Sequence, residues 1–277
     1  MLIDTFNSVF GRVIGAALYF LRGLNPWVAP VATSLLTALA MLVCYRLTSN
    51  QARIRAIKDK IIAHLLELRL YKDSLPITFR AQGKILWYNL KYLGHSARPM
   101  LVMAVPLALT MLQLDLWFGH ESLKPGESAI VKVHLRDGVR PSRESVSLEP
   151  QTGFVIETPP LRIDQGGELD WRLRASAPGC WNLVVRVNNQ AIVKNVVIGA
   201  QPHARISPAR VGRDWIDQLA NPGEPALADS SVVKMIEVGY PAGRVAVFGW
   251  RPHWLVVFLA LAVIFGFAFK GLLGVEV

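Results

Sequence analysis

Few side chains in this sequence have the types and the spacing that catalysis or metal binding requires. None of the six histidines has a second histidine or a cysteine at metal-ligand spacing; they are His64, His95, His120, His134, His203 and His253. The sequence contains no phosphate-binding loop and no GxGxxG, HExxH, CxxC or GxSxG pattern. We therefore predict that the protein is not an enzyme, and that it has no catalytic residue, no metal site and no cofactor.

A second group of polar side chains lies within or beside stretches that are otherwise apolar. These side chains are Thr33, Thr37, Arg46, Thr110 and Gln113. Lipid cannot satisfy polar groups, so such residues usually face protein or a water-filled cavity. If the faces that carry them meet, they form a mildly hydrophilic groove. Hydrogen bonds within packed helices would explain the same residues, with Arg46 extending to the lipid head groups.

Three apolar stretches would place these residues in a lipid bilayer. Hydrophobic residues make up 52% of the chain, and the last stretch has no charge between Arg251 and Lys270. A bilayer core requires about 20 mostly apolar helical residues. We therefore predict membrane-spanning helices at 27–47, 99–118 and 252–270. The alternative is that one or two of these stretches are buried helices of a soluble core.

The distribution of basic residues predicts how these helices cross the membrane. Ten Lys or Arg and three acids lie between Asn50 and Arg98, whereas 119–251 has sixteen bases and fourteen acids. Cytoplasmic loops are enriched in Lys and Arg, so 50–97 is predicted inside and the N-terminus and 119–251 outside. Cys44 and Cys180 then lie on opposite sides, which excludes a disulfide framework. The basic side chains expected to make contacts are Arg53, Arg55, Lys58, Lys60, Arg69, Lys72, Arg80 and Lys84.

The basic segment at 50–97 has the pattern of a cytosolic helical hairpin. Its first arm repeats apolar residues at helical spacing: Ile54, Ile57, Ile61, Leu65 and Leu68. A turn at Asp73–Pro76 precedes a second amphipathic helix over Ile77–Tyr92, and Gly94–Pro99 is expected to end the hairpin. The arms are amphipathic helices or a short coiled-coil pair. A basic stripe also occurs in nucleic-acid-binding proteins, but beside membrane spans it predicts contact with anionic lipid or ribosomal RNA, and not with DNA.

The remaining segments are an N-terminal helix and a β-rich region. Residues 1–24 repeat apolar side chains at helical spacing, which predicts an amphipathic helix in the membrane interface or, alternatively, a core helix of a soluble domain. Short alternating runs over 120–200 predict an extracytoplasmic all-β, Ig-like sandwich. Residues 201–250 are predicted as an irregular linker or interfacial segment, with a helical piece near Trp215–Leu219 and a strand or interfacial segment at Val232–Val247.

Two stretches of this sequence, and the order of its elements, resemble a known family. The exit from the first span, TSNQARIRAIKDKI, and the entry into the second, ARPMLVMAVPLALTMLQL, are similar to segments of the YidC-type membrane protein insertases. The resemblance is greatest to the three-span archaeal YidC-like proteins and to the insertase subunit of the endoplasmic-reticulum membrane protein complex. It covers about residues 1–118 and, by position, the third span.

This resemblance implies an insertase or membrane chaperone whose clients are nascent membrane proteins, with the ribosome or a translocon as a further partner. A polar groove would lower the cost of moving the client's polar flanks across the bilayer. Thr33, Thr37, Arg46, Thr110 and Gln113 would belong to that groove. Met100 and Met103 would add an adaptable apolar surface for varied client helices.

Two other functions remain open from the sequence. The chain fits a non-catalytic scaffold anchored in the membrane, whose β-sandwich binds an envelope protein. It also fits a subunit of an oligomeric channel or transporter, because three spans enclose no pore alone. We predict the bacterial inner membrane as the location, with the hairpin in the cytoplasm and the β domain in the periplasm.

Overall fold

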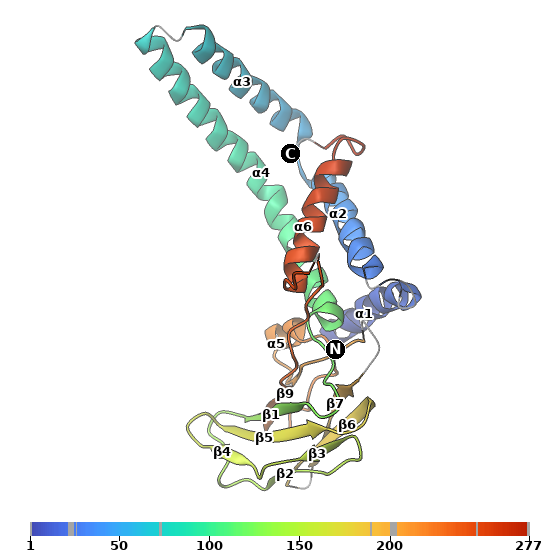
Figure 1. Ribbon diagram of the computed structural model, residues 1–277. Helices are drawn as coiled ribbons and strands as arrows, with labels where there is room; N and C mark the ends of the chain where they lie inside the picture. Colours follow the sequence, from blue (N-terminus) through green and yellow to red (C-terminus); the bar gives the residue numbers. More distant parts are fainter. Residues whose placement is uncertain are drawn as a thin grey trace. The chain divides into compact units, whose positions relative to one another are not determined.

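The computed structural model describes residues 2–21, 25, 27–71, 74–188, 190–199, 204–247 and 249–275. The chain divides into two compact units (Figure 1). One is helical and consists of Pro30–Thr110 and Phe258–Val277. The other consists of Met1–Ala29 and Met111–Val257 and holds the β-strands. Each unit is described by itself below.

Four helices supply the helical unit. They are α2 (Val28–Thr48), α3 (Gln51–Leu70), α4 (Leu75–Phe118) and α6 (Trp254–Phe269). Between α2 and α3 the chain has only Ser49 and Asn50. The Asn50 side chain accepts a hydrogen bond from the backbone N–H of Arg53 at 3.1 Å, which caps the first turn of α3. The polar exit from the first apolar stretch therefore starts a new helix at once.

The break expected at Gly94–Pro99 is absent, because α4 continues through it for 44 residues. Pro99 and Pro106 both lie inside the helix. Each removes a backbone donor, but proline is tolerated in apolar helices where other groups take up the freed carbonyls. The Thr110 hydroxyl donates to the carbonyl of Pro106 at 2.8 Å, which adds a side-chain hydrogen bond within the turn that follows the proline. The hairpin's second arm and the second apolar stretch are therefore one helix, about 66 Å long at 1.5 Å per residue.

Two of these helices, α2 and α4, are long and apolar enough to cross a membrane. The third apolar helix, α6, has 16 residues, slightly fewer than the roughly 17 that a spanning helix needs. It begins at Trp254, whereas the sequence suggested a span starting at 252. The coarse prediction of apolar helices joined to a β domain is confirmed, and all three membrane spans stay predictions.

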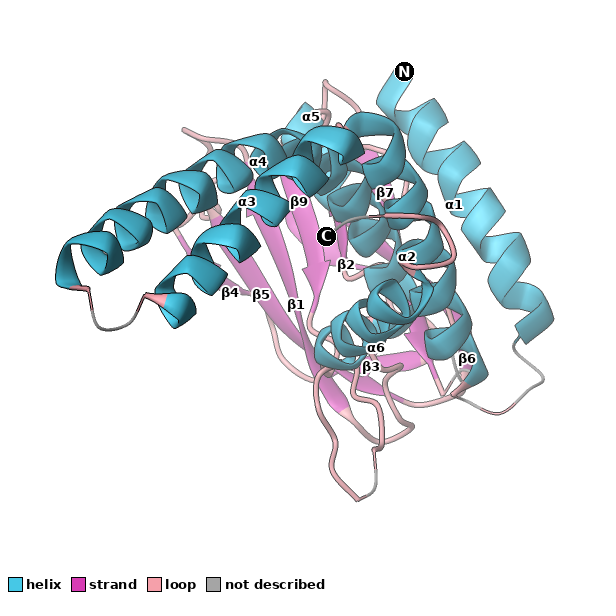
Figure 2. Ribbon diagram, turned by 90° about the horizontal axis from the view of Figure 1, so that it is seen from above, coloured by secondary structure: helices cyan, strands magenta, loops and turns pink. Residues whose placement is uncertain are grey.

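The two arms of the hairpin contact each other through a mixed apolar and aromatic seam. Figures 1 and 2 both show α3 running back beside α4. Ile54 and Ile57 are buried on this seam, as expected, but Leu65 is exposed. His64 occupies the seam instead, because its ring stacks on Tyr88 with 5.7 Å between centroids. The apolar residues at helical spacing thus predicted the contacting face of α3 correctly at Ile54 and Ile57, whereas farther along the helix His64 lies in the seam and its neighbour Leu65 does not.

Among the described residues, nine strands form two antiparallel sheets in the second unit. The larger sheet has the order β3-β5-β1-β9-β8, with β4 also paired to β5; the smaller is β2-β6-β7. The strands are β1 (Ser128–Leu135), β2 (Val146–Leu148), β3 (Phe154–Ile156), β4 (Leu161–Ile163), β5 (Glu168–Ala175), β6 (Gly179–Val187), β7 (Gln190–Ile198), β8 (Ala209–Val211) and β9 (Val233–Val238). Alternate side chains of both sheets, such as Val131, Leu169 and Leu183, form one core. The predicted β domain is confirmed at this level.

The assignment of 201–250 to a linker requires correction. Within it, β9 pairs along its length with β1 inside the larger sheet, and β8 pairs with β9. Val233, Ile236 and Val238 of β9 are buried in the common core. A short helix, α5 (Trp215–Ala220), lies between these strands close to the position predicted for it. The β domain extends to β9 because the larger sheet would otherwise leave the edge of β1 and its core face uncovered.

The N-terminal helix α1 (Leu2–Leu21) packs on the β-containing unit. Asn7 is buried, and its side-chain N–H donates to the carbonyl of Gln218 in α5 at 3.0 Å. Val9, Val13 and Tyr19 are exposed on the same helix. The buried face of α1 thus includes both Asn7 and the apolar Leu18, and its exposed face carries apolar side chains beside the polar Ser8 and Arg12.

Candidate functional site

A groove of about 430 Å³ lies in the helical unit, between α2, α4 and α6. Each helix contributes one face, because its lining residues recur three or four positions apart. On α2 these residues include Thr37, Met41 and Tyr45, and on α6 they run from Leu259 to Lys270. The groove is open to the surroundings rather than enclosed. It is therefore a surface that a segment of another molecule can enter from the side.

Most of the groove is apolar and lined by flexible side chains. Met41 projects from α2, and Met100 and Met103 project from α4. Methionine has three rotatable bonds and a polarisable sulfur, so it adapts to differently shaped apolar partners. Thr37 is buried beside these residues as the polar group nearest the middle of α2. This part of the groove suits varied apolar segments better than a single rigid ligand.

The polar residues of the groove gather at the end from which the hairpin leaves. Tyr45, Tyr92 and Ser96 all line that end. Lys270 is the one charged residue among the described residues that line the groove, and its ammonium nitrogen lies 5.0 Å from the centroid of the Phe267 ring. This contact holds the ammonium over an aromatic face at the groove mouth. The groove thus changes from apolar in its middle to polar and cationic at one end.

A small cluster beneath the groove mouth sets the position of Lys270. Leu42 and Tyr45 of α2 pack with Ile54 of α3 and with Val275, which follows α6. The chain after α6 turns back, and the N–H of Val275 donates to the carbonyl of Lys270 at 2.9 Å. Both the start of the hairpin and the segment after α6 are therefore tied to the same end of the groove.

The structure brings together only part of the predicted groove. Thr37, Met100 and Met103 line it. Thr33 and Thr110 do not; their hydroxyls donate to the carbonyls of Pro30 and Pro106 in their own helices. Such bonds to the preceding turn are the ordinary way for threonine to be satisfied in a helix.

Arg46 and Gln113 are also not among the residues that line this groove. Arg46 is exposed and is not among the lining residues, although it follows the lining residue Leu42 by four positions and so lies at the edge of the lining face of α2. Gln113 belongs to the other unit, where it is buried against Gly11 of α1. The expectation that Thr33, Thr37, Arg46, Thr110 and Gln113 share one cavity is therefore wrong.

The sequence analysis missed most of the lining residues, among them Met41, Ser96 and Lys270. Met41 follows Thr37 by four positions, so the spacing along the first apolar stretch was a usable signal. Lys270 was treated as the end of a span. Nothing in its local sequence shows that the following turn directs it over a groove.

The basic side chains of the hairpin are mostly exposed. Arg53, Arg55, Arg69 and Arg80 are exposed, and Lys84 is half-buried. Lys58 and Lys60 lie over the rings of Tyr92 and Tyr88, at 5.7 Å and 5.4 Å from their centroids. Lys72 lies outside the described residues. The hairpin therefore presents a basic surface on which two of the lysines also join its arms.

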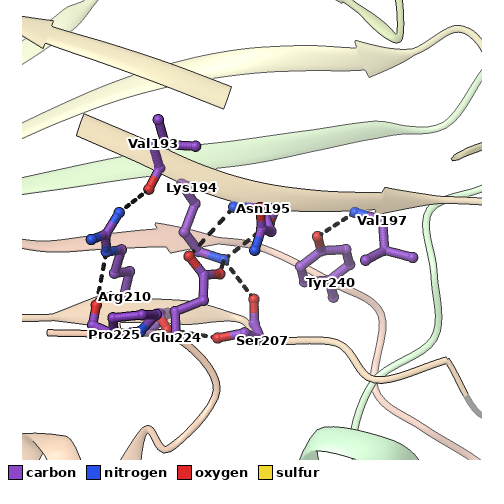
Figure 3. Close-up of polar contacts among 10 residues, drawn as sticks. Val193, Lys194, Asn195, Val197, Ser207, Arg210, Glu224, Pro225 and Tyr240 are labelled. Carbon is purple, nitrogen blue, oxygen red and sulfur yellow. Dashed lines mark hydrogen bonds and ion pairs between the residues drawn. The ribbon is translucent and has the colours of Figure 1, made fainter. Parts of the chain in front are cut away.

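The β-containing unit holds a buried ion pair that the sequence analysis did not anticipate (Figure 3). Lys194 of β7 occupies an inward-facing core position and is fully buried, and its ammonium nitrogen lies 2.6 Å from the Glu224 carboxylate. The ammonium also donates to the carbonyls of Ser207 at 2.7 Å and Asn195 at 3.0 Å. Desolvation lowers the pKa of Lys194, and the Glu224 carboxylate opposes that shift.

Side chains around this pair cover the outer edge of β7. Glu224 accepts from the N–H of Asn195, Tyr240 accepts from the N–H of Val197 at 3.0 Å, and Arg210 donates to the carbonyl of Val193 (Figure 3). Unpaired edge strands otherwise invite association with other chains. The ion pair and its neighbours therefore complete the sheet and are a structural feature rather than a reactive site.

The described residues offer no cluster of metal-binding side chains. No group of three or more His, Cys, Asp or Glu among them is placed to hold a metal ion. Within this part of the chain the cysteines are free thiols, Cys44 in the helical unit and Cys180 in the β-containing unit. No protein-family model, curated protein or solved structure matches this chain. The groove is thus the candidate site that geometry alone supports best.

Proposed function

We propose that this protein is a YidC-like membrane protein insertase or chaperone, and that the groove between α2, α4 and α6 receives an apolar segment of a client. The observation that carries the proposal is the open, methionine-lined groove, with hydroxyl groups and Lys270 at one end. An apolar segment would contact the methionines while its polar flank interacts with Tyr45, Ser96 and Lys270. Polar partners at that end lower the cost of bringing the flank to membrane depth, since lipid offers it none.

The same proposal includes a membrane arrangement. We place the protein in the bacterial inner membrane with α2, α4 and α6 as spans, the N-terminus outside, the basic hairpin in the cytoplasm and the β domain in the periplasm. The charge of the hairpin supports this orientation. The outward valines of α1 support its location in the membrane interface. Client chains are the partners, with the ribosome or a translocon at the hairpin and membrane lipid around the spans. The mechanism is non-catalytic and uses no cofactor.

A scaffold function is the second candidate. Its supporting observation is a group of exposed apolar side chains on the β-containing unit, Val155 and Leu161, which would suit an envelope protein as partner. The β domain would then be the working part, as an Ig-like sandwich. A groove that served only to pack helices would be closed, and the open groove therefore favours the insertase proposal.

Insertion of a single-span client into proteoliposomes tests the proposal, with a matched pair of substitutions on one helix. Ala262 lines the groove, whereas Ala268 lies on the opposite side of α6 and is exposed. Ala262→Trp fills much of the groove and should abolish most insertion; Ala268→Trp should leave it unchanged. Lys270→Gln should slow insertion of a client with acidic flanks, and Arg46→Gln should not.

Insertion that is the same with and without the protein would refute the function itself. Equal activity of Ala262→Trp and Ala268→Trp would show that clients do not use the groove. A pull-down of the full-length protein from envelope extract, compared with Leu161→Gln, tests the scaffold alternative. Loss of a stoichiometric partner in that variant, with insertion unaffected by the protein, would establish the scaffold function instead.

A further inference from the structure

A continuous apolar stripe runs along α4, from the hairpin tip into the apolar stretch. Phe79, Leu86, Leu90 and Leu93 are exposed on the hairpin arm, and Leu101 continues the row. These residues recur at helical spacing and so share one face. Between them the same face carries only small residues: Gly83, Gly94 and Ala97. A side chain added at Gly83 or Gly94 would meet no atom within 4 Å. Among the described residues, nothing therefore covers this face at Gly83 and Gly94.

This stripe cannot be explained by the helix pair itself. The seam with α3 lies on the opposite face of α4, where Ala81 is buried and Tyr88 contacts His64. Leu86 and Leu90 are 74% and 61% exposed, although the hairpin arm is too polar to lie within a membrane. Exposing large apolar side chains on a soluble arm is costly, and contiguous exposed patches mark interaction sites.

A row of bases borders the stripe on one side. Arg80, Lys84, Lys91 and Arg98 recur at four- and seven-residue intervals, which keeps them on one side of the helix. On the other side the neighbours are the neutral Gln82 and Asn89. A helix that covers the stripe and carries acids along one flank would therefore complement it in both shape and charge.

The direction of α4 favours a protein helix over a membrane surface as the occupant. The helix passes without a break from the hairpin arm into the stretch that is apolar enough to span. Figure 1 shows its course within the helical unit as a nearly straight rod. A stripe parallel to such an axis leads away from the bilayer rather than lying on it. It also reaches the groove, because Leu93 lies on the stripe and lines the groove as well.

We propose that this stripe is a docking track for an apolar, helix-forming segment with acidic residues along one flank, which it delivers to the groove edge at Leu93. The delivery step rests on the proposed insertase function and the choice of a protein helix on the proposed membrane arrangement, whereas the apolar stripe and its basic border rest on neither. The small residues at positions 83, 94 and 97 allow close approach of the docked helix. The basic row orients that helix by pairing with its acidic flank.

The test uses the full-length protein in nanodiscs of neutral lipid and a synthetic amphipathic helix with a leucine face bordered by glutamates. Fluorescence anisotropy should show binding that the doubly substituted Leu86→Gln, Leu90→Gln protein weakens by roughly tenfold or more, because each leucine buries its side chain in the complex. Leu66→Gln on α3 is the matched control, since Leu66 is also about as exposed, and it should not change binding. A peptide bordered by lysines should bind more weakly, and Lys91→Gln with Arg98→Gln should reduce that preference.

Several outcomes would overturn the docking track. Equal binding of both peptides would do so, and so would unchanged peptide binding by the Leu86→Gln, Leu90→Gln protein. The third outcome is that the wild-type protein binds anionic vesicles, that these substitutions abolish this binding, and that the peptide does not compete with it. Self-association of the protein that the same substitutions remove would assign the stripe to a second copy instead. Peptide binding that behaves as expected in a protein without insertion activity would leave the track standing and refute the insertase function. The two proposals therefore fail separately.

Discussion

Replacing Lys194 by methionine should destabilise the β-containing unit strongly. The ammonium group is fully buried and bonds to Glu224, Ser207 and Asn195. Lys194→Met keeps the side-chain length and apolar contacts but leaves the Glu224 carboxylate, itself only 5% exposed, without its counter-ion. Removing one partner of a buried pair costs about 3–5 kcal/mol. The two backbone carbonyls also lose a donor.

Thermal unfolding of the full-length protein in detergent measures this cost. For a chain of this size a change of 1 kcal/mol shifts the midpoint by about 2–4 °C, so the variant should unfold roughly 6–20 °C earlier. Lys132→Met is the control, because Lys132 forms a comparable ion pair with Glu168 at 2.8 Å but its side chain is 42% exposed. Exposed pairs contribute about 0–1 kcal/mol. The control should therefore shift the midpoint by at most a few degrees.

A second variant separates the loss of the Lys194–Glu224 attraction from the cost of leaving the buried Glu224 carboxylate unpaired. Lys194→Met combined with Glu224→Gln removes the unpaired carboxylate and should recover a large part of the stability. Hydrogen exchange should then show renewed protection at Asn195, whose N–H bonds to Glu224. If Lys194→Met and Lys132→Met unfold at the same temperature, or if the second substitution recovers nothing, the reasoning that the buried charge dominates is refuted.

Two further predictions concern the β-containing unit. Gly243→Ala should destabilise it by roughly 1–3 kcal/mol, because the added carbon would overlap the carbonyl of Phe118. Gly138→Ala is the comparison, because an added carbon there meets no neighbour but the positive φ of 86° is unfavourable for alanine. The unfolding midpoint should be lower for Gly243→Ala than for Gly138→Ala if the overlap costs more than the φ. Burial, and then the neighbouring Glu168, raise the pKa of Asp170. The folded state therefore binds this proton more tightly than the unfolded state, and the resulting stabilisation is lost as the pH rises through the raised pKa of Asp170. Asp170→Asn should therefore unfold later than wild type at pH 7, with the difference vanishing below the ordinary carboxyl range near about pH 4; a difference that does not depend on pH would contradict the assignment.

The helices and most of the strands could be predicted from the sequence because local patterns dominate there. Apolar stretches, the Asn50 cap and the alternation in β1 and β5 each reflect contacts between near neighbours along the chain. The end of the hairpin was misplaced because Pro99 normally stops a helix, whereas an apolar helix tolerates it. The extent of the β domain was underestimated because β9 gains its place through pairing with β1, about a hundred residues earlier.

The candidate site was likewise predictable in part from the sequence. Sequence by itself determined that the helical unit holds apolar stretches, that its hairpin is basic, and that Thr37 belongs to a candidate inner face, because residue type and position along the chain carry that information. Met100 and Met103 were expected at the groove from the family resemblance alone. Tertiary structure alone decided which faces meet. It placed Lys270 of the α6 segment at the groove and left Arg46 outside it, since the lining residues of α2 end at Tyr45. It also separated Gln113 from the other predicted groove residues, because long-range packing against α1 holds that side chain in the other unit.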